Sequence, residues 1–164
     1  MSDQKHQRVV ALDSMTLVWG IRKHGASEKT EHAGFLFSEL ERDKAQIIIP
    51  SVVVAEYITP ISSHDERTKV VAAMSERFFI VPFDADDAVL AAKLYSEGKS
   101  SRAMKKPGTR VCLRADALIV ATAKNHGAQE FYTDDNDCYA MASKIMTARR
   151  LPTTAPYLGD FLDK

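Results

Sequence analysis

Short, continuous apolar runs recur along the chain and alternate with longer segments of helical spacing. Runs of this kind are typical of strands buried on both faces, as in a parallel sheet. They predict four strands, which are Arg8–Leu12, Ile47–Ile49, Phe78–Phe83 and Glu130–Thr133.

The segments between the strands predict helices, because their apolar residues return to one side with a period of about 3.6. The predicted helices are residues 31–43, 52–61, 66–77, 84–97, 113–126 and 138–149, and a further one starts within 15–21. Strand and helix therefore alternate, which predicts an α/β sandwich with a mostly parallel central sheet.

Several local details follow from residue type. We expect Ser51 to cap the helix that follows it and Gly127 to end the apolar helix that precedes it. Gly98–Arg110 is expected to be a loop. The buried side of the helix before that loop is predicted to be Val89, Leu90, Ala92 and Leu94.

Length and composition fit one globular domain. The chain has 164 residues, 45% hydrophobic and 27% charged, and we expect a single domain over 1–164 with a core of about 8–150. No apolar run approaches the roughly 20 residues that span a bilayer, and Met1–Arg8 lacks the apolar core of a signal peptide. We therefore expect a cytoplasmic protein without a membrane partner. Cys112 and Cys138 fit no metal-ligand pattern and are predicted to be reduced thiols.

Acidic side chains come where strands end. Asp13 directly follows the first predicted strand, Glu56 lies on the helix after the second, and Asp116 lies near the start of a later helix. Three further acids follow the fourth predicted strand, namely Asp134, Asp135 and Asp137. Sites in open parallel sheets form beyond the carboxyl ends of the strands, so these carboxylates could share one edge.

Two of these acids stand in apolar segments. Glu56 follows a run of valines, and Asp116 is followed by a mostly apolar helix. A buried carboxylate needs a partner or a metal. Asp116 could instead favour a helix N-terminus, and Glu56 could pair with an arginine, so both alternatives stay open.

Gathered carboxylates favour a divalent cation. Two unit charges about 4 Å apart repel by about 4 kcal/mol at an effective dielectric of 20, and a cation removes that repulsion. Hard oxygen ligands suit Mg²⁺ or Mn²⁺. A hydroxyl of Ser14 or Thr133 could orient water or phosphate, or simply cap a turn. The histidines fit no ligand spacing and are predicted to lie at the surface or at helix ends, namely His6, His24, His32, His64 and His126.

Four segments together resemble the PIN-domain family. They are residues 9–14 (VVALDS), 47–56 (IIIPSVVVAE), 115–123 (ADALIVATA) and 131–137 (FYTDDND), and they occur in the family's order. The resemblance implies a PIN-like three-layer α/β/α sandwich and Mg²⁺- or Mn²⁺-dependent cleavage of RNA. It also implies a VapC-like toxin of a VapBC-type pair, with a cognate antitoxin and a homodimer.

The resemblance also assigns roles to the acids. It implies that Asp13, Glu56, Asp116 and Asp135 are catalytic and hold the metal, and that Asp137 supplements or replaces Asp135. Two positions depart from the family's pattern. Asp134 stands where members often have a basic or polar residue, and Cys138 stands where many have an aromatic residue.

Charge is balanced overall but uneven along the chain. The formal net charge is zero, with 22 basic and 22 acidic side chains, which argues weakly against a nucleic-acid binder. Basic residues nevertheless gather just before the Asp116 helix, where they could hold a phosphate backbone or form a solvated surface. The candidate substrate-binding residues there are Lys105, Lys106, Arg110 and Arg114, the last of which could also pair with an acid.

Two other functions remain open on the residues alone. A Mg²⁺-dependent phosphatase or phosphotransfer domain also places aspartates at strand ends, but the haloacid-dehalogenase type needs Asp-x-Asp, and Asp13-Ser14-Met15 lacks the second acid. A receiver domain needs an early acidic pair, which is also missing. A non-catalytic PIN-like module that binds RNA or protein is the other alternative, although such a module would be expected to lose acids that this chain keeps.

Overall fold

Five parallel strands form the centre of the molecule. The computed structural model describes residues 7–23, 27–101 and 109–153. The strands lie in the order β3-β2-β1-β4-β5, and each neighbouring pair is parallel. Their bounds are β1 Val9–Leu12, β2 Gln46–Pro50, β3 Phe79–Val81, β4 Glu130–Tyr132 and β5 Thr147–Arg149.

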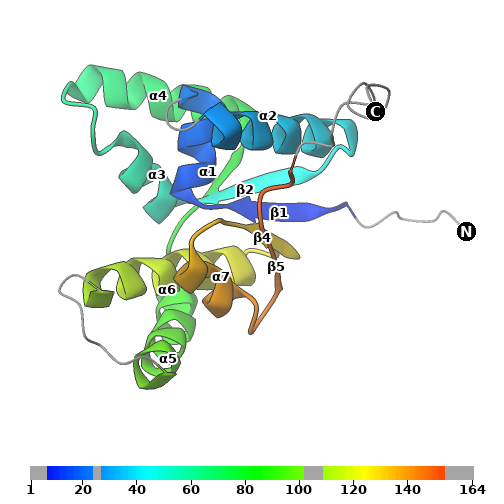
Figure 1. Ribbon diagram of the computed structural model, residues 1–164. Coiled ribbons are helices and arrows are strands. Elements are labelled where there is room, and N and C mark those ends of the chain that lie inside the picture. The colour runs from blue at the N-terminus through cyan, green and yellow to red at the C-terminus, as the bar shows by residue number, and fades with distance from the viewer. Residues whose placement is uncertain (1–6, 24–26, 102–108, 154–164) are drawn as a thin grey trace, which may run out of the picture.

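Helices cover both faces of this sheet (Figure 1). Their bounds are α1 Ser14–Leu17, the π-helix η1 Val18–Arg22, α2 Ser27–Arg42, α3 Ser51–Ile58, α4 His64–Arg77, α5 Ala85–Ser101, α6 Thr109–Asn125 and α7 Asn136–Ala142. The chain moves outward from β1 to β2 and β3, and then returns to the other side of β1 with β4 and β5. Right-handed crossovers therefore put α1 to α4 on one face and α5 to α7 on the other. The predicted α/β sandwich is confirmed.

The burial of the central strands explains why continuous apolar runs predicted them. Val10, Ala11 and Leu12 are fully buried, as are Ile49 and Phe131 on the neighbouring strands. Side chains on both faces of these strands meet helices, so continuous apolar runs replace the alternation of a half-exposed sheet.

The strand order reverses between β1 and β4. Leu12 is in register with Tyr132, and the backbone N–H of Asp13 donates to the carbonyl oxygen of Tyr132 over 3.2 Å. Ligands of open α/β sheets bind at such a reversal, beyond the carboxyl ends of the strands. The residues that directly follow β1 and β4 therefore lie side by side at this edge.

The helix predicted over residues 138–149 is correct as far as Ala142 and wrong beyond it. Helix α7 ends at Ala142, and after a turn the chain forms β5, the edge strand beside β4. Backbone hydrogen bonds fix this pairing, from Thr147 N–H to the Gln129 carbonyl (3.2 Å) and from Thr133 N–H to the Arg149 carbonyl (3.0 Å). Pairing with the sheet overrides a local helical preference.

The buried side predicted for α5 is also partly wrong. Leu94 is buried, but Val89 and Ala92 are exposed. The buried face instead contains Asp87 and Ala91 together with Leu94, at spacings of four and three residues. The pattern of apolar residues does not show this buried face, because one of its residues, Asp87, is charged. Helices α5 and α6 also take up both ends of the predicted loop 98–110, of which 102–108 lies outside the described residues.

Three smaller expectations are corrected or confirmed. Ser51 is the first residue of α3 rather than its cap, which is Pro50 without a side-chain hydrogen bond. His32 is buried within α2, whereas His64 at the start of α4 is exposed. His6 and His24 lie outside the described residues.

Cys112 and Cys138 are free thiols, the first exposed and the second buried. Among the helices of the described ranges, none combines the length and the apolar character needed to cross a bilayer.

Candidate active site at the carboxyl ends of β1 and β4

Asp13 is the fixed centre of the acidic edge. Its side chain is buried and caps α1, with Oδ1 accepting from the backbone N–H of Thr16 over 2.7 Å. Its other oxygen, Oδ2, accepts from the hydroxyl of Thr133 over 2.5 Å. Asp13 comes from β1 and Thr133 from β4, so the two bonds hold the carboxylate across the reversal of the sheet.

Burial dominates the electrostatics of Asp13. Loss of solvent raises the pKa of its carboxyl group, and hydrogen bonds from Thr133 and Thr16 act in the opposite direction. The charge of Asp134 raises the pKa further. A buried carboxylate beside another acid is stabilised when a cation binds next to it.

Thr133 links Asp13 to the acidic turn after β4. Besides donating to Asp13, its hydroxyl oxygen accepts from the backbone N–H of Asp135 over 3.0 Å. The Oδ1 atom of Asp135 caps α7 by accepting from the backbone N–H groups of Asp137 and Cys138, each over 2.8 Å. The turn is thus held by side chains at both ends.

The charges of three acids act on one buried thiol, that of Cys138. Burial raises the pKa of the Cys138 thiol well above its usual range, and the negative charges of Asp116, Asp13 and Asp135 raise it further. These carboxylates come from α6, from the end of β1 and from the turn after β4. Three segments that are distant in sequence therefore bring acids to the neighbourhood of Cys138.

Glu56 does not occupy the buried position that its apolar segment suggested. It is exposed on α3, whose buried residues are Val53, Val54 and Tyr57. No ion pair joins it to an arginine among the described side chains, so that alternative finds no support. Helix α3 nevertheless packs against α1, which Asp13 caps, and against α6, which carries Asp116.

Asp134 has a structural role that its sequence position did not indicate. Its Oδ2 atom pairs with Nζ of Lys29 in α2, and its Oδ1 atom accepts from the backbone N–H of Leu151 over 3.1 Å. Lys29 lies between the helices predicted within 15–21 and over 31–43, so the sequence did not single it out. The pair joins α2 to the turn after β4.

The candidate substrate-binding residues are only partly accounted for. Ser14 is the first residue of α1, directly after Asp13, and is half-buried. Lys105 and Lys106 lie outside the described residues, and of Arg110 only the backbone, at the start of α6, is described. Arg114 is exposed, with its guanidinium carbon 5.3 Å from the ring centre of Tyr95 on α5.

Arg150 is a second cation that sequence reasoning missed. Its Nη2 atom donates to Oδ1 of Asn136 over 2.7 Å, and Nη1 donates to the carbonyl oxygen of Thr133 over 3.5 Å. The guanidinium carbon lies 4.1 Å from the ring centre of Tyr139 on α7. Arg150 thus folds back over the turn that carries Asp135.

The model of one family, described as the PIN domain, matches residues 10–144. The chain belongs to the PIN-domain family. This match includes the carboxyl ends of β1 and β4 and every acid described above.

Three solved structures have the same fold as this PIN domain. One is VapBC2 from Rickettsia felis bound to a DNA fragment from their promoter, with 17% identity, a TM-score of 0.60, and coverage of 88% of this chain and 99% of that one. A second is DNA-bound VapBC from Salmonella typhimurium, with 16% identity, a TM-score of 0.61, and coverage of 89% of this chain and 100% of that one. A third is VapBC-1 from nontypeable Haemophilus influenzae, with 12% identity, a TM-score of 0.59, and coverage of 87% of this chain and 98% of that one. No curated protein matches the chain.

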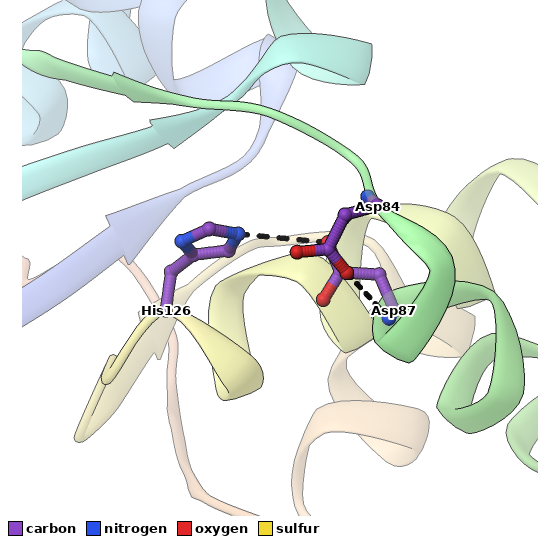
Figure 2. A group of neighbouring side chains, drawn as sticks. All are labelled: Asp84, Asp87 and His126. Carbon is purple, nitrogen blue, oxygen red and sulfur yellow. Dashed lines mark hydrogen bonds and ion pairs between the residues drawn. The ribbon is translucent and has the colours of Figure 1, made fainter.

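A separate cluster of potential ligands lies away from this edge of the PIN domain. Among the described residues, three ligand-type side chains come within 4.8 Å of one another at Asp84, Asp87 and His126 alone, and the predicted acids form no group that tight (Figure 2). His126 is ten residues beyond Asp116, and ten residues of helix span about 15 Å. Sequence reasoning missed this cluster because its members are not regularly spaced.

Hydrogen bonds join the two aspartates of the cluster to each other, whereas Nε2 of His126 makes no hydrogen bond with any described residue. The backbone N–H of Asp84 donates to Oδ2 of Asp87, and that of Asp87 donates to Oδ1 of Asp84, each over 3.1 Å. This is a capping box at the start of α5. Asp87 also accepts from Nδ2 of Asn125 over 2.9 Å and faces Nε2 of His126 at 3.6 Å. The cluster therefore fastens α5 to the end of α6.

Proposed function

We propose that this PIN domain is a Mg²⁺- or Mn²⁺-dependent endoribonuclease that hydrolyses RNA phosphodiester bonds. Its acidic ligands and catalytic residues are Asp13, Glu56, Asp116 and Asp135, with Asp137 supplementing or replacing Asp135. The observation that carries the proposal is the acidic edge at the reversal of the strand order, where Thr133 bonds both to Asp13 and to the turn of Asp135 and where the charge of Asp116 reaches the same buried Cys138.

The donor set fits a hard divalent cation. The groups near Cys138 are carboxylates, and the residue bonded to Asp13 across the sheet is a hydroxyl donor. Oxygen donors of this kind suit Mg²⁺ and Mn²⁺ rather than softer metals. When bound, such an ion supplies a more acidic water and stabilises charge on the phosphate and leaving oxygen.

The chain's own residues prepare this edge for that chemistry. Thr133 and the N–H of Thr16 fix the orientation of Asp13, so its carboxylate needs little reorganisation when it acts. Asp116 is presented from the first half of α6 and Asp135 from the cap of α7. Glu56, exposed on α3, can swing toward the other acids because burial does not fix its side chain.

We further propose that the chain is the toxin of a VapBC-type pair, with a cognate antitoxin protein and a homodimeric state. The likeness of its fold to chains from three VapBC structures supports this assignment. We propose a cytoplasmic location for the chain, because that is where its RNA substrate and antitoxin would be.

Cleavage of a mixed pool of structured and unstructured RNA tests the proposal. The wild-type chain should cut RNA with Mg²⁺ or Mn²⁺ and not with EDTA. Asp13→Asn and Asp116→Asn should each abolish cleavage and keep a cooperative unfolding transition, because each removes one ligand charge and relieves repulsion. Asp86→Asn is the matched control, since Asp86 is an exposed acid on α5.

Three readouts separate the parts of the proposal. Metal-dependent cutting that persists in Asp13→Asn or Asp116→Asn would contradict the site assignment.

Expression of the wild-type chain should arrest growth where Asp116→Asn does not, and normal growth would contradict the toxin role. The purified protein should have about twice the monomer mass of 18.2 kDa, and a monomeric mass would contradict the homodimer.

A further inference from the structure

Two cations, each placed over an aromatic ring, flank the acidic turn after β4. On one side, Nζ of Lys29 lies 5.7 Å from the ring centre of Trp19 and pairs with Asp134. On the other side, the guanidinium of Arg150 lies 4.1 Å from the ring centre of Tyr139. The acids that we propose as catalytic lie on this turn and next to it.

The side chain of Lys29 is held by its ion pair with Asp134 and is still accessible to a ligand from solvent. Its side chain is 39% exposed, whereas that of its partner Asp134 is only 15% exposed. Asp134 is anchored in turn by the backbone N–H of Leu151. The ammonium group therefore has a fixed position on the acidic turn, against Asp134 and one residue from Asp135. A phosphate that crosses this turn would meet the ammonium group.

Arg150 is similarly placed at the other side of the turn. It is exposed, and its hydrogen bonds to Asn136 and to the carbonyl of Thr133 keep it beside Asp135. Arg150 and Tyr139 also line an open groove of about 570 Å³, which Arg149 and Tyr132 continue along the β5 edge. The cation and the ring thus lead from the acidic turn into a hollow on the surface.

We propose that a single-stranded segment of RNA crosses the acidic turn, with one phosphate on Lys29, another on Arg150 and a base stacked on Tyr139. The proposal rests on the proposed function and adds how the substrate is held. The scissile phosphate would lie between the two contacted phosphates, next to Asp13 and Asp135.

The chemistry of these three side chains selects this ligand. Lysine and arginine bind phosphate oxygens without reading sequence. Aromatic rings and guanidinium planes stack on bases that are not paired, which excludes the interior of a duplex. Alternating cations and rings along a groove are the usual arrangement for single strands.

A purely structural reading of Lys29 makes a different prediction. If Lys29 serves only to neutralise Asp134, then removing both charges together should leave RNA binding unchanged. Lys29→Met with Asp134→Asn does this at constant net charge, and the asparagine Oδ1 can still accept from Leu151. If Lys29 binds phosphate, this double variant should bind RNA as weakly as Lys29→Met alone does.

The test measures binding by fluorescence anisotropy across a salt series. The probe is a labelled RNA of about 12 nucleotides, within the usual range of single-strand site sizes, compared with the same strand annealed to its complement. All variants are made in the Asp116→Asn background so that the probe stays intact. They are Lys29→Met, Lys29→Met with Asp134→Asn, Arg150→Met, Arg150→Lys and Tyr139→Leu. Lys124→Met is the control, because Lys124 is exposed at the far end of α6.

The parent should prefer the single strand. Loss of Lys29 or Arg150 should flatten the log–log salt dependence by about 0.7 each, the value for one phosphate contact on a single strand. Tyr139→Leu should weaken binding roughly fivefold or more without changing that slope. Arg150→Lys should keep the slope and lose affinity, because the ammonium cannot stack as a guanidinium plane does.

Three results would each overturn the inference. The first is unchanged RNA binding in the Lys29 and Arg150 variants, and the second is RNA binding restored to the parent's level in the double variant. The third is equal affinity of the parent for the single strand and the duplex. The proposed function is tested apart from it, by metal-dependent cleavage in the wild-type chain. If the wild type cuts RNA and the variants bind normally, this inference fails alone. If the wild type does not cut, the binding series in the Asp116→Asn background still decides where RNA is held.

Discussion

Thr133 carries no charge, yet it positions two of the acids. The sequence left open whether its hydroxyl orients substrate or caps a turn. The structure shows the second role, because the hydroxyl donates to Asp13 and accepts from the N–H of Asp135. The side chain is fully buried, so neither partner has water as a replacement.

Replacing Thr133 by valine should therefore destabilise the fold. The isosteric side chain leaves the buried Asp13 carboxylate without one donor and the N–H of Asp135 without its acceptor. We expect a loss of about 1–3 kcal/mol in the free energy of unfolding, measured in urea. Thr133→Ser keeps the hydroxyl and should lose less. Equal stability of Thr133→Val and the wild type would mean that the two bonds contribute nothing net.

Residue type alone identified some members of the edge and not others. The positions of Asp13 and Asp135 at this edge could be predicted, because both come just after strands whose ends are visible in the pattern. The role of Asp116, which lies within α6, stays a prediction. The positions of Lys29 and Arg150 could not be predicted. The ion pair of Lys29 spans 105 residues of sequence, and nothing in the local pattern says which cation folds back on which acid.

At the scale of elements, four of the five strands were predictable, including the edge strand β3, but the other edge strand, β5, was not. The central strand β1 is an unbroken apolar run, so its own residues are enough to predict that it is buried on both faces. Strand β5 has three residues, of which Thr147 and Arg149 are exposed, and it exists because β4 offers an unpaired edge. Its cause lies in another segment of the chain.

The start of α5 illustrates how a polar cluster fastens elements together. Asp87 is fully buried and takes part in the capping box with Asp84 and in hydrogen bonding with Asn125 at the end of α6. Replacement by alanine should cost about 1–3 kcal/mol in the free energy of unfolding, because two part-buried donors lose their acceptor and the buried carboxylate leaves a gap. The matched control is Asp86→Ala, which removes an exposed carboxylate one residue earlier. Thermal unfolding of both variants measures the difference, and equal midpoints would contradict a stabilising role.

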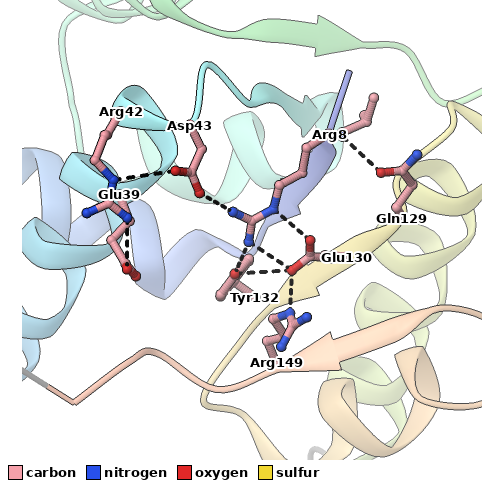
Figure 3. A network of polar contacts seen from close by, with 9 residues as sticks. Arg8, Glu39, Arg42, Asp43, Gln129, Glu130, Tyr132 and Arg149 are labelled. Atoms are coloured by element: carbon pink, nitrogen blue, oxygen red, sulfur yellow. Dashed lines mark hydrogen bonds and ion pairs between the residues drawn. The ribbon is translucent and has the colours of Figure 1, made fainter. Parts of the chain in front are cut away.

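At the scale of the whole molecule, a net charge of zero conceals local concentration of charge. The balance of 22 basic and 22 acidic side chains argued weakly against nucleic-acid binding. In the fold, much of that charge is paired across elements. Arg8, ahead of β1, contacts Glu130 on β4 and Asp43 after α2, and Glu130 also pairs with Arg149 on β5 (Figure 3). Such pairs form only on folding, so a count from the sequence cannot tell which cations remain available.

This network predicts how stability depends on pH. The hydrogen bond from Arg8 is the largest cause that lowers the pKa of Glu130 below its usual 4.5, and Arg149 adds to it. A carboxyl group whose pKa is lower in the folded state stabilises the fold above the unfolded pKa. That contribution is lost as the pH falls below about 4.5 through the folded pKa. The free energy of unfolding should therefore drop more steeply between about pH 5 and pH 3 in the wild type than in Glu130→Gln.

Urea unfolding at a series of pH values measures this difference. At neutral pH, Glu130→Gln should be the less stable protein, because Arg8 and Arg149 lose their charged partner. The two curves should converge in acid, where protonated Glu130 resembles glutamine. Glu41→Gln is the control, since Glu41 is exposed near the end of α2 and should follow the wild-type curve. Parallel curves for the wild type and Glu130→Gln would show that the three strands are held together without this charge.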